Sequence, residues 1–512
     1  MGRVSRLEGV NVTLKFAGRF AVALGVWCVS AGIAAAAAGS KLNILLIDIE
    51  DCNAAALGCY GNPICKTPNL DAFCRTAVRF DRAYVQAVCC NPSRTSFLTG
   101  LRPETTRVLS NGDVMSQRLP EGTLTLPEML KQSGFYLADI GKLFHKIDYA
   151  EKQMAVFDRI EMYDRPKGWS GPDPIVVFPP SRRKAVPDPA PRDQTSKEYK
   201  AWKQRRSDRY GDSGLLVEEE RDYRMAAAAV ALLREFARAD RPFFLAVAQS
   251  RPHTPLIAPK KFIDMYDPSQ IPPPPAPPDS LTDFPYMKRA LGTNPDIFTR
   301  GQPTPQQARE AIAAYYACLS FVDQNVGMIL RALEESGLAE KTVVVFLGDH
   351  GFHLGDHGFW SKYSMLAETH RAPLVIRVPG AKANGQACDA IVEFVDLVPT
   401  LGEICGFKIP DKLEGLSFAP LFSDPAQPWK TASFIAGCDF NAGECVRTRK
   451  FSYAEFSRGP VRAALFDLQK DPWETRNVVN DPGYAAALKD MRELLKAGWT
   501  NALPPAGLAS RP

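Results

Sequence analysis

Four short apolar segments, each followed at once by charged or polar residues, constrain the fold of this chain most. They are residues 43–47, 135–140, 242–247 and 342–347. Helical patterns lie between them, the clearest from Pro305 to Ser336, where apolar residues recur every three or four positions. Alternating apolar strands and helices predict an α/β fold with a large, mostly parallel sheet flanked by helices. Such sheets bind ligands at the carboxyl ends of their strands, so we expect the polar residues there to form one site.

The pattern changes after about residue 425. Short β-like runs near residues 432–435, 446–456 and 463–468 precede a final helical segment from Tyr484 to Gly498. We therefore expect a catalytic domain over residues 40–425 and a smaller C-terminal α+β domain over residues 426–512.

The first 38 residues have the composition of a secretory signal peptide. Basic residues between Arg3 and Arg19 precede an uncharged run from Phe20 to Ala38 that ends in small side chains. We predict that residues 1–38 are a signal peptide, that the protein is secreted or periplasmic, and that no stable membrane insertion remains after cleavage. An uncleaved membrane anchor is the alternative, since an apolar run of this length can just span a bilayer.

The cysteines also fit an exported protein. Twelve cysteines are many for a cytosolic enzyme and ordinary for a secreted one. Spacing alone does not pair them. Cys438 and Cys445 flank a turn that contains Gly and Asn, and they are our first prediction for a local disulfide.

The strongest chemical signal is the segment Cys90-Asn91-Pro92-Ser93-Arg94, which continues to Leu98-Thr99-Gly100. Proline is favoured in a first helical turn and glycine just after a last one, so Pro92 to Thr99 is predicted to be a short helix. Cys90 would then lie at the amino end, where unpaired N–H groups favour anions and lower the pKa of a thiol. The segment predicts a nucleophile that acts on an anionic substrate.

This segment resembles the modification motif of the sulfatase family, C-x-P-S-R followed by L-T-G, whose cysteine is oxidised to formylglycine. The resemblance extends over most of residues 43–500 and includes Gly141 to His145, Pro252 to Pro255, Asp349 to Gly351 and Trp360 to Ser364. The G-K-L-F-H and W-S-K-Y-S forms are most similar to the iduronate-2-sulfatase branch. The resemblance implies the alkaline-phosphatase-like fold.

The resemblance implies a catalytic set of Cys90, Arg94, Lys142, His145, His253 and Lys362. Cys90, as hydrated formylglycine, would attack the sulfur atom, and Arg94 would hold the hydrate. His253 would protonate the leaving alcohol. His145 would accept the proton when the second hydroxyl expels sulfate.

A divalent cation, expected to be Ca²⁺, is implied at a site made by Glu50, Asp51, Cys90, Asp349 and His350. Carboxylate oxygens suit a hard cation of this kind. Glu50 departs from the family pattern, which usually has two aspartates here. Lys142 and Lys362 would clamp the sulfate oxygens beside the metal and neutralise developing charge.

The implied activity is hydrolysis of a sulfate ester on a sulfated carbohydrate, after maturation by a formylglycine-generating enzyme. Residues 181–210 carry ten Lys or Arg against four Asp or Glu. They form either a solvated insertion or a basic rim that attracts a polyanion. Nucleic acid is not an expected partner, because no recognised binding motif accompanies this run.

Two alternative functions use the same sequence features. The first is a phosphomonoesterase or phosphonate esterase on the same scaffold, against which the complete motif around Cys90 argues. The second is a non-catalytic, glycan-binding descendant, which would be expected to have lost Cys90, Arg94, Lys142 or a metal-binding acid. All of these residues are present.

Overall fold

The computed structural model describes residues 41–145, 150–162, 175–177, 197–281, 296–299, 301–438, 443–457 and 461–505. The predicted signal peptide, residues 1–38, and residues 181–196 of the basic run lie outside the described residues. Residues 42–512 cluster as one unit. Among the described helices, none combines the length and the apolar character that crossing a bilayer requires.

The main sheet confirms the predicted α/β fold. It has nine strands, in the order β11 (Ala387–Glu393), β2 (Val78–Tyr84), β10 (Leu374–Arg377), β9 (Thr342–Gly348), β1 (Asn43–Ile49), β7 (Phe243–Gln249), β3 (Tyr136–Gly141), β4 (Arg159–Met162) and β5 (Ile175–Val177). Every pairing between these strands is parallel except those of β10, which runs antiparallel to β2 and β9. Because β1, β7, β3 and β9 all run the same way, their carboxyl ends share one edge.

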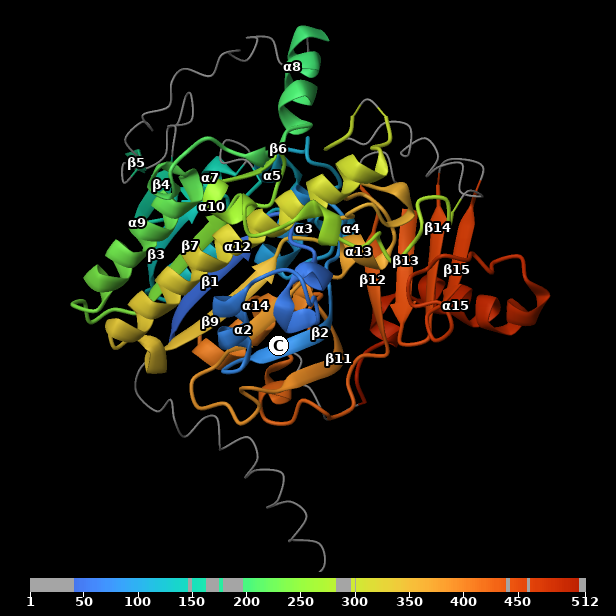
Figure 1. Cartoon of the computed structure of the whole chain (residues 1–512). Coiled ribbons are helices and arrows are strands. Elements are labelled where there is room, and N and C mark those ends of the chain that lie inside the picture. The colour runs from blue at the N-terminus through green and yellow to red at the C-terminus, as the bar shows by residue number, and fades with distance from the viewer. Residues whose placement is uncertain are drawn as a thin grey trace, which may run out of the picture. The chain divides into compact units, whose positions relative to one another are not determined.

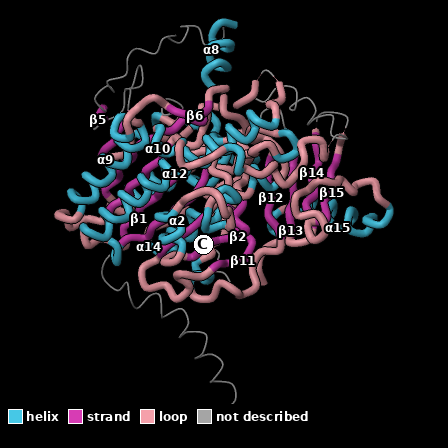
Figure 2. Tube along the Cα trace, in the orientation of Figure 1, coloured by secondary structure: helices cyan, strands magenta, loops and turns pink. Residues whose placement is uncertain are grey.

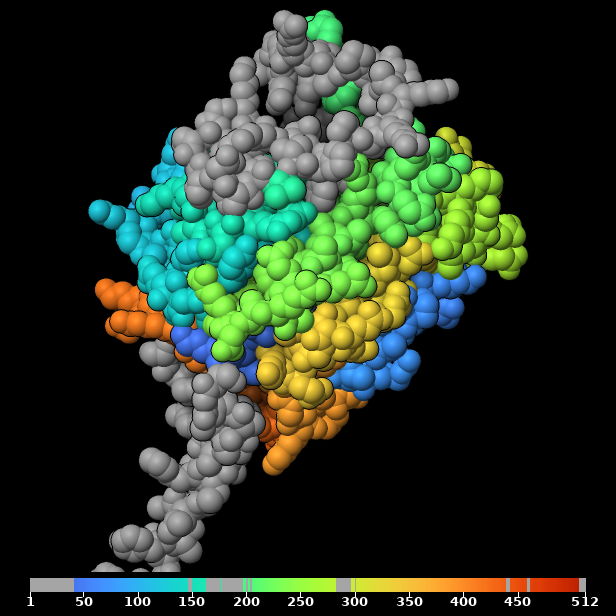
Figure 3. Space-filling view, turned by 90° about the vertical axis from the view of Figure 1, so that its left-hand side faces the viewer, coloured from blue at the N-terminus to red at the C-terminus, as the bar shows by residue number. Residues whose placement is uncertain are grey.

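Helices cover both faces of this sheet (Figure 1, Figure 2). One face packs on α2 (Pro68–Cys74), α9 (Arg221–Phe236) and α12 (Pro305–Glu335), and the other on α3 (Cys90–Thr99), α6 (Leu126–Gln132) and α14 (Leu397–Cys405). The side chains of β1 alternate between the two apolar cores, Leu45 and Ile47 facing one and Ile44 and Leu46 the other. Figure 3 shows the green segment that contains α9 beside the yellow segment that contains α12.

The longest helix, α12, begins and ends where its sequence predicts. The Thr304 side chain accepts a hydrogen bond from the Gln307 amide, the Gln307 side chain accepts one from the Thr304 amide, and Pro305 occupies the first turn. Gly337, in the left-handed conformation, follows the helix end.

A second sheet follows the main one along the chain (Figure 1). It is an antiparallel meander of β12 (Ala432–Ala436), β13 (Gly443–Thr448), β14 (Phe451–Phe456) and β15 (Ala463–Asp467), on which α15 (Ala485–Ala497) packs. This is the predicted α+β element. The sequence predicted one run over residues 446–456, but a turn divides it into β13 and β14.

The remaining elements are short. They are α4 (Pro103–Thr106), α5 (Met115–Arg118), α7 (Glu151–Met154), α8 (Lys197–Ser207), β6 (Tyr210–Asp212), β8 (Leu256–Ala258), α10 (Lys260–Ile263), α13 (Ala367–His370) and several single 3₁₀ turns.

A buried ionic cluster joins the main sheet to the segment that enters β12. Glu393, at the end of β11, lies 2.7 Å from Arg102 and 2.8 Å from Lys430, and Lys430 also lies 2.7 Å from Asp396. Burial alone would raise the pKa of Glu393. Arg102 and Lys430 more than offset burial and lower that pKa to about 2.

The Glu393→Gln variant tests this cluster. We expect the free energy of unfolding to fall by about 3 kcal/mol at neutral pH, because the change leaves Arg102 and Lys430 buried with one carboxylate fewer. A depressed pKa stabilises the fold above the ordinary value of 4.5, and this stabilisation is lost as the pH falls towards about 2. Urea unfolding of both proteins at pH 7 and pH 3 should therefore show a smaller difference at the lower pH. An equal difference in the free energy of unfolding at both pH values would contradict the lowered pKa of Glu393.

Candidate active site

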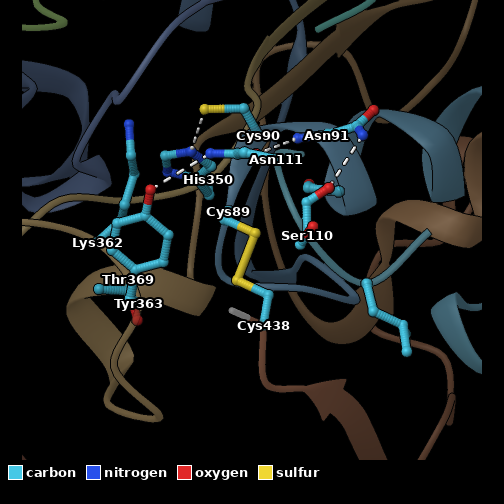
Figure 4. Close-up of a disulfide and its surroundings, with 12 residues drawn as sticks. Cys89, Cys90, Asn91, Ser110, Asn111, His350, Lys362, Tyr363, Thr369 and Cys438 are labelled. Atoms are coloured by element: carbon cyan, nitrogen blue, oxygen red, sulfur yellow. Dashed lines mark hydrogen bonds between the residues drawn. A yellow bond between two sulfur atoms is a disulfide. The ribbon is translucent and has the colours of Figure 1, made fainter. Parts of the chain in front are cut away.

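The carboxyl edge of the main sheet brings the predicted metal-binding residues together. Cys90 Sγ lies 3.2 Å from His350 Nε2 and 3.9 Å from Glu50 Oε1, and Figure 4 shows the Cys90–His350 contact. Two sets of ligand atoms each lie within 4.8 Å of one another, and both include Cys90: one adds Asp51 and His350, the other Glu50 and Asp349. All five side chains are buried.

Asp51 is held in an unusual backbone conformation. Its φ of 58° is left-handed, which is uncommon for a residue with a side chain and is frequent at functional sites. The Asp51 amide donates to Asp349 Oδ1 at 3.0 Å, and the Tyr315 hydroxyl of α12 donates to the Asp51 carbonyl at 2.7 Å. Helix α12 and the residue that follows β9 therefore hold the backbone of Asp51 in place.

His350 and His253 both present Nε2 to the cluster. The Gly351 carbonyl accepts from Nδ1 of His350 at 2.9 Å, and the Thr254 carbonyl accepts from Nδ1 of His253 at 3.0 Å. With Nδ1 used as a donor, Nε2 of the neutral ring carries a lone pair. Nε2 of His253 lies 3.9 Å from both Glu50 Oε1 and Asp51 Oδ2. Burial first, and then the two lysines, lower the pKa of His253 well below its usual value.

Both predicted lysines reach the carboxylates. Lys362 Nζ donates to the two oxygens of Asp51 at 2.8 and 3.0 Å, and Lys142 forms an ion pair with Glu50. Burial lowers the pKa of Lys142 to about 7. Asp296, whose carboxylate lies 4.0 Å from Lys362 Nζ, was not predicted from the sequence.

Arg94 lies fully buried at the centre of the cluster. It forms ion pairs with Asp48 of β1 and with Asp349, the latter at 3.0 Å, and donates to the carbonyl oxygens of Lys142 and Leu143. One guanidinium thus ties α3 to β1, to the residue after β9 and to the loop after β3. His145 is half-buried on that same loop, three residues beyond Lys142.

Two buried acids near Arg94 were not predicted from the sequence. Burial raises the pKa of Asp48 to about 7, and it raises that of Asp139 in β3 well above its usual value. Neither carboxylate oxygen of Asp139 has a hydrogen-bond partner among the described residues. The signal that could have revealed both acids is a charged residue inside an otherwise apolar strand.

The predicted disulfide between Cys438 and Cys445 is wrong. Cys438 is bonded to Cys89, the residue before the candidate nucleophile (Figure 4), and the Cys445 thiol is buried in β13 beside the Ser452 hydroxyl. Sheet pairing explains the long-range bond, because the Ala436 amide at the end of β12 donates to the carbonyl of Gln86 at 2.8 Å. The bond anchors the start of α3 to the second sheet.

Hydrogen bonds also fix the other side of Cys90. The Asn91 amide donates to Asn111 Oδ1 at 2.9 Å, and Asn111 Nδ2 donates to the Tyr363 hydroxyl at 3.3 Å (Figure 4). Tyr363 directly follows Lys362 and has a left-handed φ of 77°. This chain of contacts links the start of α3 to the loop that carries Lys362.

Known proteins share both the sequence and the fold. The sulfatase family model matches residues 42–407, and the model for the C-terminal region of N-sulphoglucosamine sulphohydrolase matches residues 355–500. Iduronate 2-sulfatase of Mus musculus is 31% identical over 435 residues, which cover 78% of this chain and 75% of the mouse protein. A sulfatase of Formosa agariphila is 30% identical over 89% of this chain and 86% of its own length.

The solved structure of a phosphonate monoester hydrolase from Agrobacterium radiobacter has the same fold, with a TM-score of 0.70 and 23% identity over 91% of this chain and 96% of that one. At this identity the likeness concerns the fold alone. The family match, in contrast, spans most of the chain and includes every strand that contributes to the Cys90 cluster. This protein therefore belongs to the sulfatase family and is a sulfuric ester hydrolase.

Proposed function

We propose that this sulfatase removes sulfate from a sulfated carbohydrate, with formylglycine made from Cys90 as the nucleophile and one divalent cation beside it. The observation that supports this most is the place of Cys90. Its thiol lies at the amino end of α3 within 3.9 Å of both His350 and Glu50, in one buried cluster with two lysines. Hydrated formylglycine would supply an oxygen nucleophile at this point.

The side chains present fit a divalent cation. The cluster contains the buried carboxylates of Asp48, Glu50, Asp51 and Asp349, and Lys142 and Lys362 form ion pairs with Glu50 and Asp51. Oxygen donors predominate among these side chains, so Ca²⁺ suits the site best. Glu50, Asp51, Asp349 and His350 would hold the ion, which when bound supplies positive charge to the nucleophile and the sulfate group.

Sulfate binding and proton transfer are assigned to other side chains of this protein. Lys142 and Lys362 bind sulfate oxygens and neutralise charge as the ester bond breaks. His253, through Nε2, gives a proton to the leaving alcohol, and binding of the anionic substrate raises its pKa towards the range needed. His145 is proposed to accept the proton when sulfate leaves. Arg94 positions Asp349 and the loop of Lys142 through its contacts, and its Nη2 has no hydrogen-bond partner among the described residues, so we also assign it to holding the hydrate.

The substrate is proposed to be a sulfated uronic acid or a similar residue of a glycan, since the mouse relative is named iduronate 2-sulfatase. The predicted signal peptide supports secretion or a periplasmic location. A formylglycine-generating enzyme would act on the chain before or during its export. Purified, matured protein should hydrolyse an aryl sulfate and a 2-O-sulfated uronate disaccharide. Faster turnover of a phosphonate monoester than of either sulfate would favour the esterase alternative.

Removal of the metal tests the cation directly. Exhaustive chelation should lower kcat/KM on an aryl sulfate by at least about a hundredfold, because a Lewis acid contributes several kcal/mol to charge stabilisation. Added Ca²⁺ should restore the activity, and Mg²⁺, which demands a stricter octahedral geometry, should restore less. Circular dichroism before and after chelation controls for unfolding. Full turnover in the chelated, metal-free protein would show that no cation is required.

A further inference from the structure

A second groove, separate from the Cys90 cluster, lies beside strand β2. Its volume is about 740 Å³, and it is lined by residues of β2, of the segment after β1, of the proline-rich stretch Pro272–Pro275 and of the second sheet with its following loop. None of the residues assigned above to catalysis or to the metal lines it. It therefore requires an explanation of its own.

The groove has a surplus of positive charge at its partly exposed wall. Arg79 pairs with Asp81 at 2.7 Å, while Arg82 and Arg449 share the single carboxylate of Asp389. These five side chains are between 29% and 55% exposed. Three guanidinium groups thus face two carboxylates, and the unmatched one remains available to a ligand.

Arg371 adds a further positive charge. Its Nε donates to the backbone carbonyl of Asp81 at 3.0 Å, its guanidinium lies 5.9 Å from the centre of the Tyr60 ring, and no carboxylate of the described residues forms an ion pair with it. Arg447 in the same groove is neutralised by the buried Glu474 at 2.7 Å. The exposed wall therefore has two guanidinium groups more than carboxylates.

The other acids of the groove do not cancel this surplus at the wall. Asp356 and Glu368 are only 5% and 9% exposed. Burial raises the pKa of Asp356 to about 6, and burial together with Asp356 raises that of Glu368 well above its usual value. One oxygen of Glu368 has no hydrogen-bond partner among the described residues.

Flat apolar surface accompanies the guanidinium groups. Trp473 is 41% exposed, an unusual exposure for so large an apolar side chain in this protein, and it lines the groove together with Pro272–Pro275. Planar guanidinium groups bind sulfate and carboxylate groups with two parallel hydrogen bonds, and a tryptophan ring offers a rigid apolar face to a sugar ring.

We propose that this groove binds an acidic oligosaccharide segment, sulfated or carboxylated, as a second carbohydrate site outside the active site. The choice of a carbohydrate as the ligand rests on the proposed function. The charge and the shape of the groove are observed independently of that function. A site of this kind would hold a long glycan chain on the enzyme while its terminal residue is processed, which raises the effective concentration of the chain at the active site.

Calorimetry with a sulfated hexasaccharide tests the groove, using the full chain with Cys90→Ser in every protein to prevent turnover. Arg371→Gln and Trp473→Ala should each weaken hexasaccharide binding by about tenfold, the loss expected for one charge-assisted hydrogen-bond pair or one stacked ring. The matched controls are Arg238→Gln, an exposed residue that follows α9, and Leu216→Ala, 68% exposed. Both controls should bind like the parent protein.

Three results would overturn the proposal. The first is unchanged hexasaccharide binding in the Arg371 and Trp473 variants. The second is hexasaccharide binding no tighter than that of inorganic sulfate. The third, measured with Cys90 intact, is a loss of aryl sulfate turnover in those variants as large as their loss of hexasaccharide binding. The last result would place the side chains in the support of the active site. Because calorimetry needs no turnover, a protein that hydrolyses no sulfate ester but binds the hexasaccharide through Arg371 would refute the proposed function and leave this inference standing.

Discussion

Replacing Cys90 with alanine should abolish sulfate ester hydrolysis, with a fall in kcat of at least about 10³-fold, because the nucleophile itself is removed. The fold should survive, since Cys90 forms no disulfide and the change removes one buried thiol. Cys405→Ala, which removes another buried thiol far along the chain in α14, is the matched control and should leave turnover nearly unchanged. The measurement is kcat and KM on an aryl sulfate, with thermal unfolding of each variant as a check on folding.

The same experiment requires evidence of the modification itself. Peptide mass spectrometry of protein expressed together with a formylglycine-generating enzyme should find the aldehyde at position 90. Cys89 should instead be recovered in a disulfide-linked peptide with Cys438. A fully active protein with an unmodified Cys90 thiol would contradict the proposed nucleophile.

Arg94→Gln should have the largest effect on stability. The change leaves the carboxylates of Asp48 and Asp349 buried without their cation, and breaking a buried pair in this way costs about 3–5 kcal/mol. Activity should also be lost, because Arg94 holds the carbonyl oxygens of Lys142 and Leu143. Urea unfolding measures the first effect and aryl sulfate turnover the second.

Two further variants sharpen the Arg94 result. Arg94→Lys keeps the charge but not the planar, forked set of donors, so it should recover part of the stability and little of the activity. Arg238→Gln, at an exposed arginine that follows α9, should change the free energy of unfolding by no more than about 0.5 kcal/mol. An unfolding free energy in Arg94→Gln equal to that of the parent would show that Asp48 and Asp349 do not depend on this guanidinium.

The central strands and the common edge of the site followed from the sequence alone. Strands such as β1 and β9 are buried on both faces, so their sequences are mostly apolar runs, broken in β1 by Asp48, and they are followed by Glu50 and by Asp349. Parallel strands place such ends on one edge of the sheet. The helix that carries Cys90 was predicted from the proline in its first turn and the glycine after its last residue. The predicted roles of these residues in catalysis remain predictions.

The edge of the sheet could not be predicted in the same way. Strands β2, β10 and β11 are short or only partly apolar, and β2 alternates buried and half-exposed residues. The alternation in β2 covers only its first four residues and β10 has only four residues, so neither segment is long enough for periodicity to separate it from a loop. Their identity as strands depends on partners that are distant in sequence, such as Val375 beside Arg79.

The charges buried within strands and the disulfide were decided only by the tertiary structure. Asp48 and Asp139 lie inside apolar runs. The positive charge that favours their ionised forms comes from Arg94, on a helix elsewhere in the chain. Cys89 and Cys438 are separated by 349 residues, and only the docking of the second sheet brings them together. Local sequence determines which residues enter a strand or begin a helix, because those preferences act over a few residues. Which buried charges and thiols meet is a property of the assembled chain.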